Sequence, residues 1–380
     1  MTLSPRRLAA VARKEFLHVL RDWRSLTLAL AIPVLLVCLF GYALTMDLNH
    51  VPTALWDQSR TPQSRDFISL LQGSPYFDIS LVPDNYRDIT AALDRRDVMV
   101  AVIIPADFAQ QLLSGRQAAI QALVDGSDSN NANLAVGYLN GLAQIFNQKV
   151  MVRRLNRAGH TRLEIPVTAE MRAWYNPDLR SVNVIVPGII ALVMAVIAAM
   201  LTSVTVAREW EMGTMEQLIS TPLRVPELVI GKVIPYFTIG MADVVLAVVM
   251  GRFVFDVPVR GNAALLFGMA SIFLCGVLFF GMMLSIVLKT QVLANQLALF
   301  ATYLPTLMLS GFVFSIHNMP PPIQVITYLV PGRYFIDTMR GIFLKGIGLE
   351  ILGLNALLLM VYAGLMVLLA HRRLRFKLEA

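Results

Sequence analysis

The chain has 380 residues, of which 56% are hydrophobic and 15% charged, and its mean hydropathy is +0.63. A soluble globular protein carries roughly 25% charged residues, so this surplus of apolar side chains excludes an ordinary soluble fold. The formal charge of +7 does not indicate a nucleic-acid-binding protein, because many basic residues stand beside long apolar runs, where they act as orientation signals. Cys38 and Cys275 are the only cysteines and both lie in apolar runs, so neither a disulfide framework nor a metal site is expected from them.

The N-terminal segment, residues 1–24, is basic and amphipathic. On a helical projection, apolar residues occupy one half of the circumference and basic residues the other, namely Leu8, Val11, Phe16, Val19, Leu20 and Trp23 against Arg6, Arg7, Arg13, Lys14, Arg21 and Arg24. This pattern predicts a cytoplasmic helix that lies on the membrane surface. A frayed terminus that serves only as a topology signal is the alternative. No small-residue cleavage pattern follows, so the first apolar run is expected to be a retained anchor.

Six apolar stretches reach about 20 residues, the length that a helix needs to cross the hydrocarbon core. They are residues 25–44, 184–207, 233–253, 263–288, 292–315 and 351–370. Short loops rich in Arg and Lys face the cytoplasm, which places both termini and the connection 207–232 on that side. The sequence therefore predicts an α-helical integral membrane protein with six transmembrane helices, in the bacterial inner membrane.

Residues 45–182 have a different composition, which is polar, mixed in charge and rich in turn residues. Strand-like runs at 53–56, 77–82, 98–104 and 120–124 alternate with helical patterns at 64–71, 86–93, 107–113 and 130–155. Alternation of this kind favours a small α/β layer. We therefore expect an inserted α/β domain on the periplasmic side.

No motif for nucleotide binding or catalysis is present in the sequence. There is no G-x-x-x-x-G-K-[ST] loop, so ATP, if it drives this protein, is bound by another subunit. The five histidines are scattered, and the H-E-x-x-H and G-x-S-x-G patterns are missing. Asp125 and Asp128 with nearby asparagines do not have the spacing of a calcium loop and instead predict a helix-capping turn. No catalytic residue, metal site or cofactor is predicted in this chain.

The connection after the second span, residues 207–232, reads AREWEMGTMEQLISTPLRVPELVIGK. This string resembles the cytoplasmic loop of ABC-2 type permeases, the membrane subunits of ATP-binding-cassette exporters, in the drug-exporter-like branch with a large periplasmic domain. In that family the loop forms a coupling helix that docks into a groove of the ATPase. The residues assigned to this coupling loop by the resemblance are Arg208, Glu209, Glu211, Gly213, Thr214, Glu216, Gln217, Thr221 and Pro222, and the match continues to Glu227, Gly231 and Lys232.

A short charged helix that begins at Gly213 and Thr214 and stops near Pro222 would be rigid enough to transmit force. A solvated loop with ordinary helix punctuation is the alternative to this coupling element. Residues 102–115, 123–140 and 309–346 also resemble the same branch.

The resemblance implies a permease subunit that exports a small, amphiphilic or drug-like substrate by alternating access. Its implied partners are an ABC ATPase, which binds ATP and Mg²⁺, and a second permease, either an identical chain or a close paralogue. Some members also act with a periplasmic adaptor and an outer-membrane channel. The alternatives are a membrane receptor or assembly factor with a ligand-binding periplasmic domain, or a lipid-modifying membrane enzyme.

Three polar residues within the apolar stretches are candidates for the translocation path. Asp243 stands near the middle of the third stretch, where a charge costs at least about 2.5 to 3.5 kcal/mol. Asn295 and Gln296 lie in the fifth stretch, and such residues commonly join helices by hydrogen bonds instead. Residues 316–348, before the last stretch, contain two apolar runs at 323–330 and 334–343 that predict short external re-entrant helices.

Overall fold

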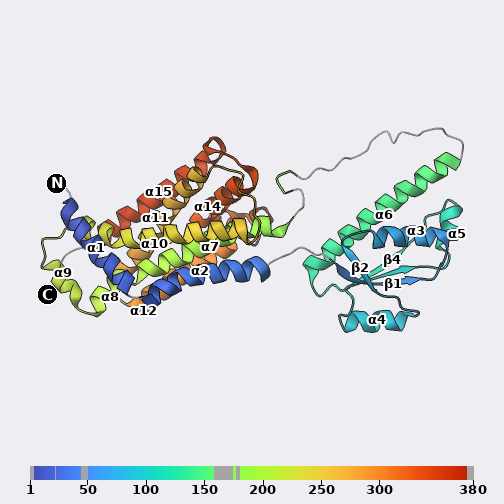
Figure 1. Ribbon diagram of the computed structural model, residues 1–380, viewed down its shortest axis with the longest axis horizontal. Helices are drawn as coiled ribbons and strands as arrows, with labels where there is room; N and C mark the ends of the chain where they lie inside the picture. The colour runs from blue at the N-terminus through green and yellow to red at the C-terminus, as the bar shows by residue number, and fades with distance from the viewer. Residues whose placement is uncertain (1–3, 22, 44–49, 158–173, 177–179, 375–380) are drawn as a thin grey trace. The chain divides into compact units, whose positions relative to one another are not determined.

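The computed structural model describes residues 4–21, 23–43, 50–157, 174–176 and 180–374. The chain divides into two compact units (Figure 1). A helical unit contains Met1–Thr45 and Ala173–Ala380, and an α/β unit contains Met46–Arg172, within the range 45–182 that composition indicated.

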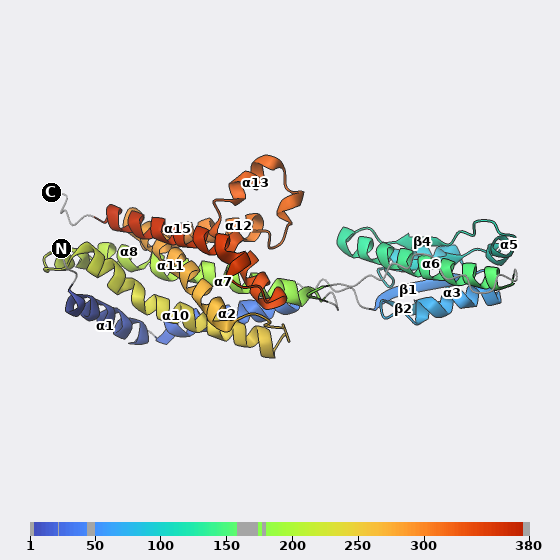
Figure 2. The same cartoon turned by 90° about the horizontal axis from the view of Figure 1, so that it is seen from above.

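Among the described residues of the helical unit, five helices are long and apolar enough to cross a membrane, at Ser181–Glu211, Val225–Phe253, Ala263–Leu288, Gln291–Leu309 and Leu349–Arg373. Helix α2, Trp23–Ala43, covers the first predicted stretch. The central helix is α7, Ser181–Ser203, in which every residue from Val186 to Ala199 is buried. It packs against α2, α10 (Val225–Phe253), α11 (Ala263–Leu288) and α12 (Gln291–Leu309), as Figures 1 and 2 show. The fold is therefore that of a helical membrane protein with five or more spans, and α15 (Leu349–Arg373) completes the bundle.

Two of these helices differ in length from the predicted stretches. Helix α10 begins at Val225 and not at 233, because Glu227 accepts the Arg224 amide at 3.1 Å in its first turn. Glu227 and Lys232 are both buried, and both have bonding partners. Helix α12 ends at Leu309 and not at 315, because Gly311 takes a left-handed φ of +82° that a continuing helix cannot hold. Hydropathy alone reports neither effect.

The connection between α12 and α15, which the sequence predicted to be external, contains two short helices, α13 (Pro321–Thr327) and α14 (Pro331–Arg340), followed by one π-helical turn at Gly341–Lys345. Both helices have proline in the first turn, as the sequence predicted for Pro331. The Arg340 guanidinium donates to the carbonyls of Gly311 at 3.0 Å and Phe312 at 3.2 Å. The end of α14 is thereby fixed to the chain that leaves α12.

The α/β unit is a four-stranded sheet with helices on both faces, which confirms the predicted α/β class. Its strands are β1 (Val51–Asp57), β2 (Phe77–Leu81), β3 (Val100–Ile104) and β4 (Gln121–Val124), in the order β2-β1-β3-β4. Strand β1 is parallel to both neighbours, and β4 is antiparallel to β3.

Alternate residues of β3 enter two separate cores in the α/β unit. Val100, Val102 and Ile104 pack with α3 (Pro62–Gln72), α5 (Phe108–Leu113) and α6 (Ser129–Arg157). Ala101 and Ile103 pack on the other face with α4 (Tyr86–Asp94), which Figure 1 shows alone on its side of the sheet. The near-continuous apolar sequence of β3 follows from this burial on both faces.

Candidate functional site

The short helix predicted from Gly213 to Pro222 is present as α9, and a second short helix, α8, precedes it. Helix α8, Thr205–Glu211, continues from α7 after a break at Val204, and α9, Thr214–Ile219, follows a turn at Gly213. Gly213 has a φ of +69°, a left-handed conformation that favours glycine. Thr214 does not cap α9, since its hydroxyl bonds to the side chain of Glu209. The last residues of the loop, from Val225, already belong to α10.

The start of α8 is bonded to α11 through the hydroxyl of Ser285. Ser285 of α11 is fully buried, and its Oγ accepts the backbone amides of Val206 at 3.0 Å and Ala207 at 2.9 Å. The first amides of a helix have no partner within the helix, so this serine caps α8 from outside. Helix α8 is therefore held by α11 as well as by α7.

Helix α1, Pro5–Arg21, lies along the first turns of α10 (Figure 2). Gly231 permits this close approach, because a Cβ atom at that position would stand 2.8 Å from Val11 Cγ1 and 3.3 Å from the Leu8 carbonyl. Phe16 and Leu20 remain 40% and 49% exposed, on a side of the helix that α10 does not cover. The amphipathic helix expected from the sequence is thus present, and one part of it is used for packing on α10.

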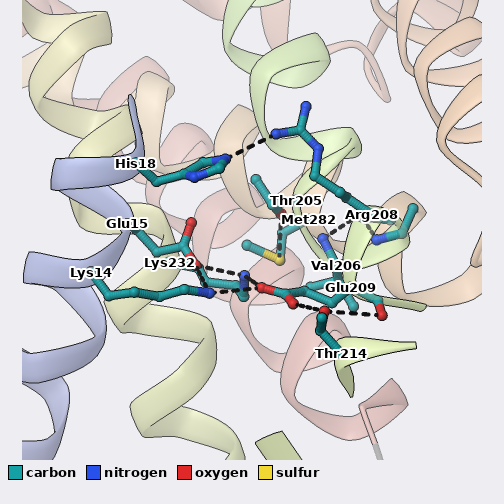
Figure 3. A network of polar contacts seen from close by, with 12 residues as sticks. Lys14, Glu15, His18, Thr205, Val206, Arg208, Glu209, Thr214, Lys232 and Met282 are labelled. Atoms are coloured by element: carbon teal, nitrogen blue, oxygen red, sulfur yellow. Dashed lines mark hydrogen bonds and ion pairs between the residues drawn. The ribbon is translucent and has the colours of Figure 1, made fainter. Parts of the chain in front are cut away.

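Four charged side chains from α1, α8 and α10 form a compact group at this junction, which we name the Lys232 cluster: Lys14, Glu15, Glu209 and Lys232 (Figure 3). Lys232 Nζ lies 2.8 Å from Glu15 Oε1 and 3.0 Å from Glu209 Oε1. Lys14 Nζ lies 2.9 Å from the same oxygen of Glu209 and 3.2 Å from Glu15 Oε1. Each carboxylate is therefore shared between two ammonium groups.

Because the group is largely buried, its charges lose more hydration than those of a surface ion pair. The Lys232 side chain is 1% exposed and that of Glu15 is 6% exposed, whereas the Lys14 side chain is 56% exposed. Two carboxylates and two ammonium groups balance, so no net charge is buried. Burial by itself raises the pKa of Glu15, but the charges and hydrogen bonds of Lys232 and Lys14 outweigh it, and the pKa lies below its ordinary value of 4.5. Glu15 is accordingly ionised at neutral pH.

Further polar contacts surround the Lys232 cluster. Arg208 approaches His18 Nε2 of α1 at 3.2 Å and donates from Nε to Gln291 Oε1 at 3.3 Å. Glu211 accepts the backbone amide of Gln291 at 2.8 Å, at the first turn of α12. The three charged residues that the resemblance placed on α8 thus all bond to neighbouring helices.

A second link joins the chain ends of α1 and α10. Glu227 is fully buried and accepts the Ser4 amide at 2.8 Å, while Arg7 Nη1 donates to the Pro222 carbonyl at 2.5 Å. The segment between α9 and α10 is in this way held at Pro222 and again at Glu227. Helix α1 consequently contacts both sides of the coupling loop.

Helix α9 has one anchored side and one free side. Met215 is 1% exposed, and Leu218 and Ile219 pack against the core of the bundle. We name the opposite surface the α9 outer face, which consists of exposed residues: Met212, Glu216, Gln217, Thr221 and Pro222. In the part of the chain that the structure describes, the Glu216 carboxylate has no hydrogen-bond or ion-pair partner. This face offers polar groups and one large apolar side chain to another surface.

The three candidates for the translocation path are not brought together. Asp243 of α10 is 5% exposed, and its Oδ1 has no hydrogen-bond partner among the described residues. On α12, Asn295 is half-buried and Gln296 is exposed. No described contact joins Asp243 to either of them.

Sequence reasoning did not assign a role to Glu15 or Ser285. A signal for Glu15 was present, because it continues the helical spacing of Leu8, Val11 and Val19 and so places an acid on the apolar side of a basic helix. For Ser285 no signal existed, since its capping partner is about eighty residues away in the chain. Within the described residues, no group of three His, Cys, Asp or Glu side chains could hold a metal ion.

Comparisons with known proteins agree with the fold class. The family described as ABC-2 family transporter protein matches residues 23–372. The chain is 38% identical over 377 residues, 98% of each chain, to the Escherichia coli (strain K12) protein named probable multidrug ABC transporter permease YbhS. It is 29% identical over 346 residues to the permease YbhR of the same strain, covering 91% of this chain and 92% of that protein.

It is also 25% identical over 368 residues, 95% of each chain, to the inner membrane transport permease YhhJ of Escherichia coli (strain K12). A family match over most of the chain and a relative of this identity and coverage decide the classification. Permeases of this kind lack ATPase domains, and they imply a partner ATPase and a second permease. The chain belongs to the ABC-2 family and is the permease subunit of an ABC transporter, with several spans in the inner membrane.

Proposed function

We propose that this permease exports small, amphiphilic or drug-like molecules, using ATP that a separate subunit hydrolyses after docking on the α9 outer face. The names of YbhS and YbhR, both multidrug permeases, support this substrate class. The observation that supports this docking site is the difference in burial between the two sides of α9. Met215 anchors α9 in the core, while Glu216 and Gln217 on the other side are exposed.

The contacts around the Lys232 cluster provide a route for movement of α9 into the membrane helices. Thr214 at the start of α9 bonds to Glu209, and Glu209 shares Lys232 of α10 with Glu15 of α1. Helix α8 continues directly from α7. A displacement of α9 by the ATPase would therefore be passed to α1, α7 and α10 through bonded groups. Asp243, Asn295 and Gln296 remain our candidates for the path that these helices open.

The proposed topology places both termini and α9 in the cytoplasm and the α/β unit in the periplasm. Basic residues before α2, between α7 and α10, and after α15 support this orientation. A membrane-impermeant maleimide tests it on a chain without Cys38 and Cys275. Asp84→Cys in the α/β unit should react in intact cells, whereas Gln217→Cys should react only after lysis. The opposite pattern would reverse the topology.

We propose that the second permease is an identical chain or a close paralogue, since two permeases of one strain are both similar to this chain. The partner ATPase binds ATP and Mg²⁺. A periplasmic adaptor and an outer-membrane channel are further candidates, for which the α/β unit would be the contact.

The primary experiment is co-expression with the ATPase encoded beside this chain, purification by a tag on this chain alone, and assay of vanadate-sensitive ATP hydrolysis in lipid. We expect a stable complex whose ATPase rate rises with transported amphiphiles. If a folded chain brings down no ATPase, the coupling role of α9 is wrong, and a receptor or assembly factor with a ligand-binding α/β unit becomes the better explanation.

A further inference from the structure

A groove runs along one face of the α/β unit, between α5, α6 and the connection from α5 to β4. Its volume is about 490 Å³. A neighbouring hollow of about 200 Å³ extends it toward α3 and shares three wall residues with it, Leu112, Phe146 and Val150. The opposite face of the sheet is occupied by α4. The described residues that line the groove therefore all belong to one side of this unit.

The inner wall of the groove is aromatic. Phe67, Phe108 and Phe146 are between 2% and 6% exposed and contact one another, with ring centroids 5.4 Å apart for Phe67 and Phe146 and 6.1 Å for Phe108 and Phe146. Ile120 and Val150 add aliphatic surface. Such a wall is held in place by its own packing, so the groove does not require a ligand to form.

The charged residues of the groove and of the neighbouring hollow differ in their pairing. In the hollow, Asp66 is paired with Arg153, so its carboxylate is neutralised. In the groove, the exposed side chains of Arg116, Gln117 and Asn147 are part of the lining. Among the residues that the structure describes, no carboxylate lies within ion-pair distance of Arg116. The groove thus combines an apolar wall with one guanidinium group and two side-chain amides.

We propose that this groove binds a free amphiphile with one apolar chain or ring system and one anionic head group, a carboxylate, sulfonate or phosphate. Its volume falls in the range of about 300 to 1,000 Å³ that is typical of small-molecule sites. The apolar part lies against the phenylalanine wall, and the head group accepts the paired N–H donors of Arg116. Gln117 and Asn147 donate to the remaining oxygens of the head group. This site is independent of the ATPase-coupling role, and it stands whether or not that role is correct.

The test uses the full chain in nanodiscs of zwitterionic phosphatidylcholine and a decanoate that carries a photoreactive diazirine at its apolar end. Cross-linked residues are mapped by mass spectrometry. We expect labels on α5, the α5–β4 connection and α6, competed by unlabelled decanoate and not by decyltrimethylammonium, which has the same chain and a cationic head. Labels confined to the membrane helices, or equal competition by the cationic amphiphile, would overturn the proposal.

Two variants sharpen this test. Arg116→Glu reverses the charge at the head-group end and should reduce labelling about tenfold, a loss in the range of one charge-assisted pair. Arg87→Glu makes the same charge change on α4, on the opposite face of the sheet, and should leave labelling unchanged. Equal loss in both variants would mean that only the overall charge of the unit matters, and the site would be rejected.

Ala143→Phe fills the groove without altering charge and should abolish labelling while circular dichroism stays unchanged. If this variant unfolds, Arg116→Glu with its control still decides the question. Nanodiscs that contain an anionic lipid separate the two sources of an anionic head group. We expect labelling to persist in them, because the ligand is a free amphiphile, and displacement by the anionic lipid would contradict this.

Discussion

Helices α8 and α9 adjoin in the sequence and both carry acidic residues, yet these residues lie in opposite environments. Glu209 and Glu211 of α8 are bonded to α10, α1 and α12. Glu216 of α9 is exposed and has no side-chain partner in the described part of the chain. Two helices of similar composition thus have different surroundings, because α8 is held in the bundle while α9 exposes the surface that we propose as the docking site of the ATPase.

Because of this contrast, substitutions in α8 and in α9 test different properties of the protein. A variant of α8 disturbs the way α1 and α10 are held together, so a loss of export would not separate folding from coupling. Substitution of Glu216, whose carboxylate has no partner among the described residues, would disturb only the contact that we propose with the ATPase. Substitutions at the Lys232 cluster should therefore reduce stability more than substitutions on the α9 outer face.

The largest effect is expected for Lys232→Met, which removes the ammonium group between two carboxylates. Glu15 and Glu209 would then share only Lys14, which is 56% exposed. Breaking a buried ion pair on one side costs about 3 to 5 kcal/mol, so the melting temperature in detergent should fall strongly. Thermal unfolding followed by circular dichroism measures it.

A double substitution provides the control for this prediction. The double variant Lys232→Met, Glu15→Gln has one uncompensated carboxylate fewer than the single variant Lys232→Met. It should therefore recover part of the lost stability. If Lys232→Met unfolds at the temperature of the unsubstituted chain, then the Lys232 cluster does not hold these helices together.

A smaller loss is expected for Gly231→Ala, which tests the contact of α1 with α10. The added methyl would lie 2.8 Å from Val11 Cγ1, so α1 must shift outward. Overpacking of this kind costs about 1 to 3 kcal/mol. Hydrogen exchange should show faster exchange in α1, while Gly353→Ala, at an open position in α15, should leave α1 unchanged. Equal protection in the two variants would mean that α1 is not held by this contact.

A pH titration tests the charge state of Glu15. The pKa of Glu15 is lowered in the folded chain. Ionised Glu15 therefore contributes stability that is fully present above pH 4.5 and is lost as the pH falls through the lowered pKa. Glu15→Gln does not titrate. The difference in melting temperature between the unsubstituted chain and Glu15→Gln should therefore shrink as the pH falls from 7 to below 4.5. A difference that stays constant or grows would show that Glu15 is not held ionised by Lys232 and Lys14.

Most of the fold could be predicted from the sequence, since hydropathy and alternation are local signals. The strands at β1 and β3 and the helices α3 and α4 lie where the pattern indicated, because each has its own buried face. The start of α10 could not be predicted in this way, since Glu227 and Lys232 are tolerated only because α1 supplies Ser4 and Glu15 as partners. Long-range bonds therefore decide such boundaries.

The candidate site was predicted by resemblance for α8 and α9, but its division into two environments was not. Which carboxylate turns inward depends on the left-handed turn at Gly213, and on the bond from Thr214 to Glu209. The loop sequence shows the acids at Glu209 and Glu216 without indicating which of them meets Lys232. The groove beside Arg116 could likewise not be predicted from the sequence, because its walls come from three separate helices.

The smallest effect on stability, and the most direct test of the comparison, is expected for Glu216→Lys. Its side chain is exposed, so the free energy of unfolding should change by no more than about 0.5 kcal/mol. If the α9 outer face docks on the ATPase, the charge reversal should weaken that complex about tenfold or more in a pull-down titration. Glu350→Lys, at an exposed position in the first turn of α15, makes the same change elsewhere and should leave binding intact. Loss of binding in both variants, or in neither, would place the ATPase contact outside α9, and Glu209 would then be a structural residue with no part in coupling.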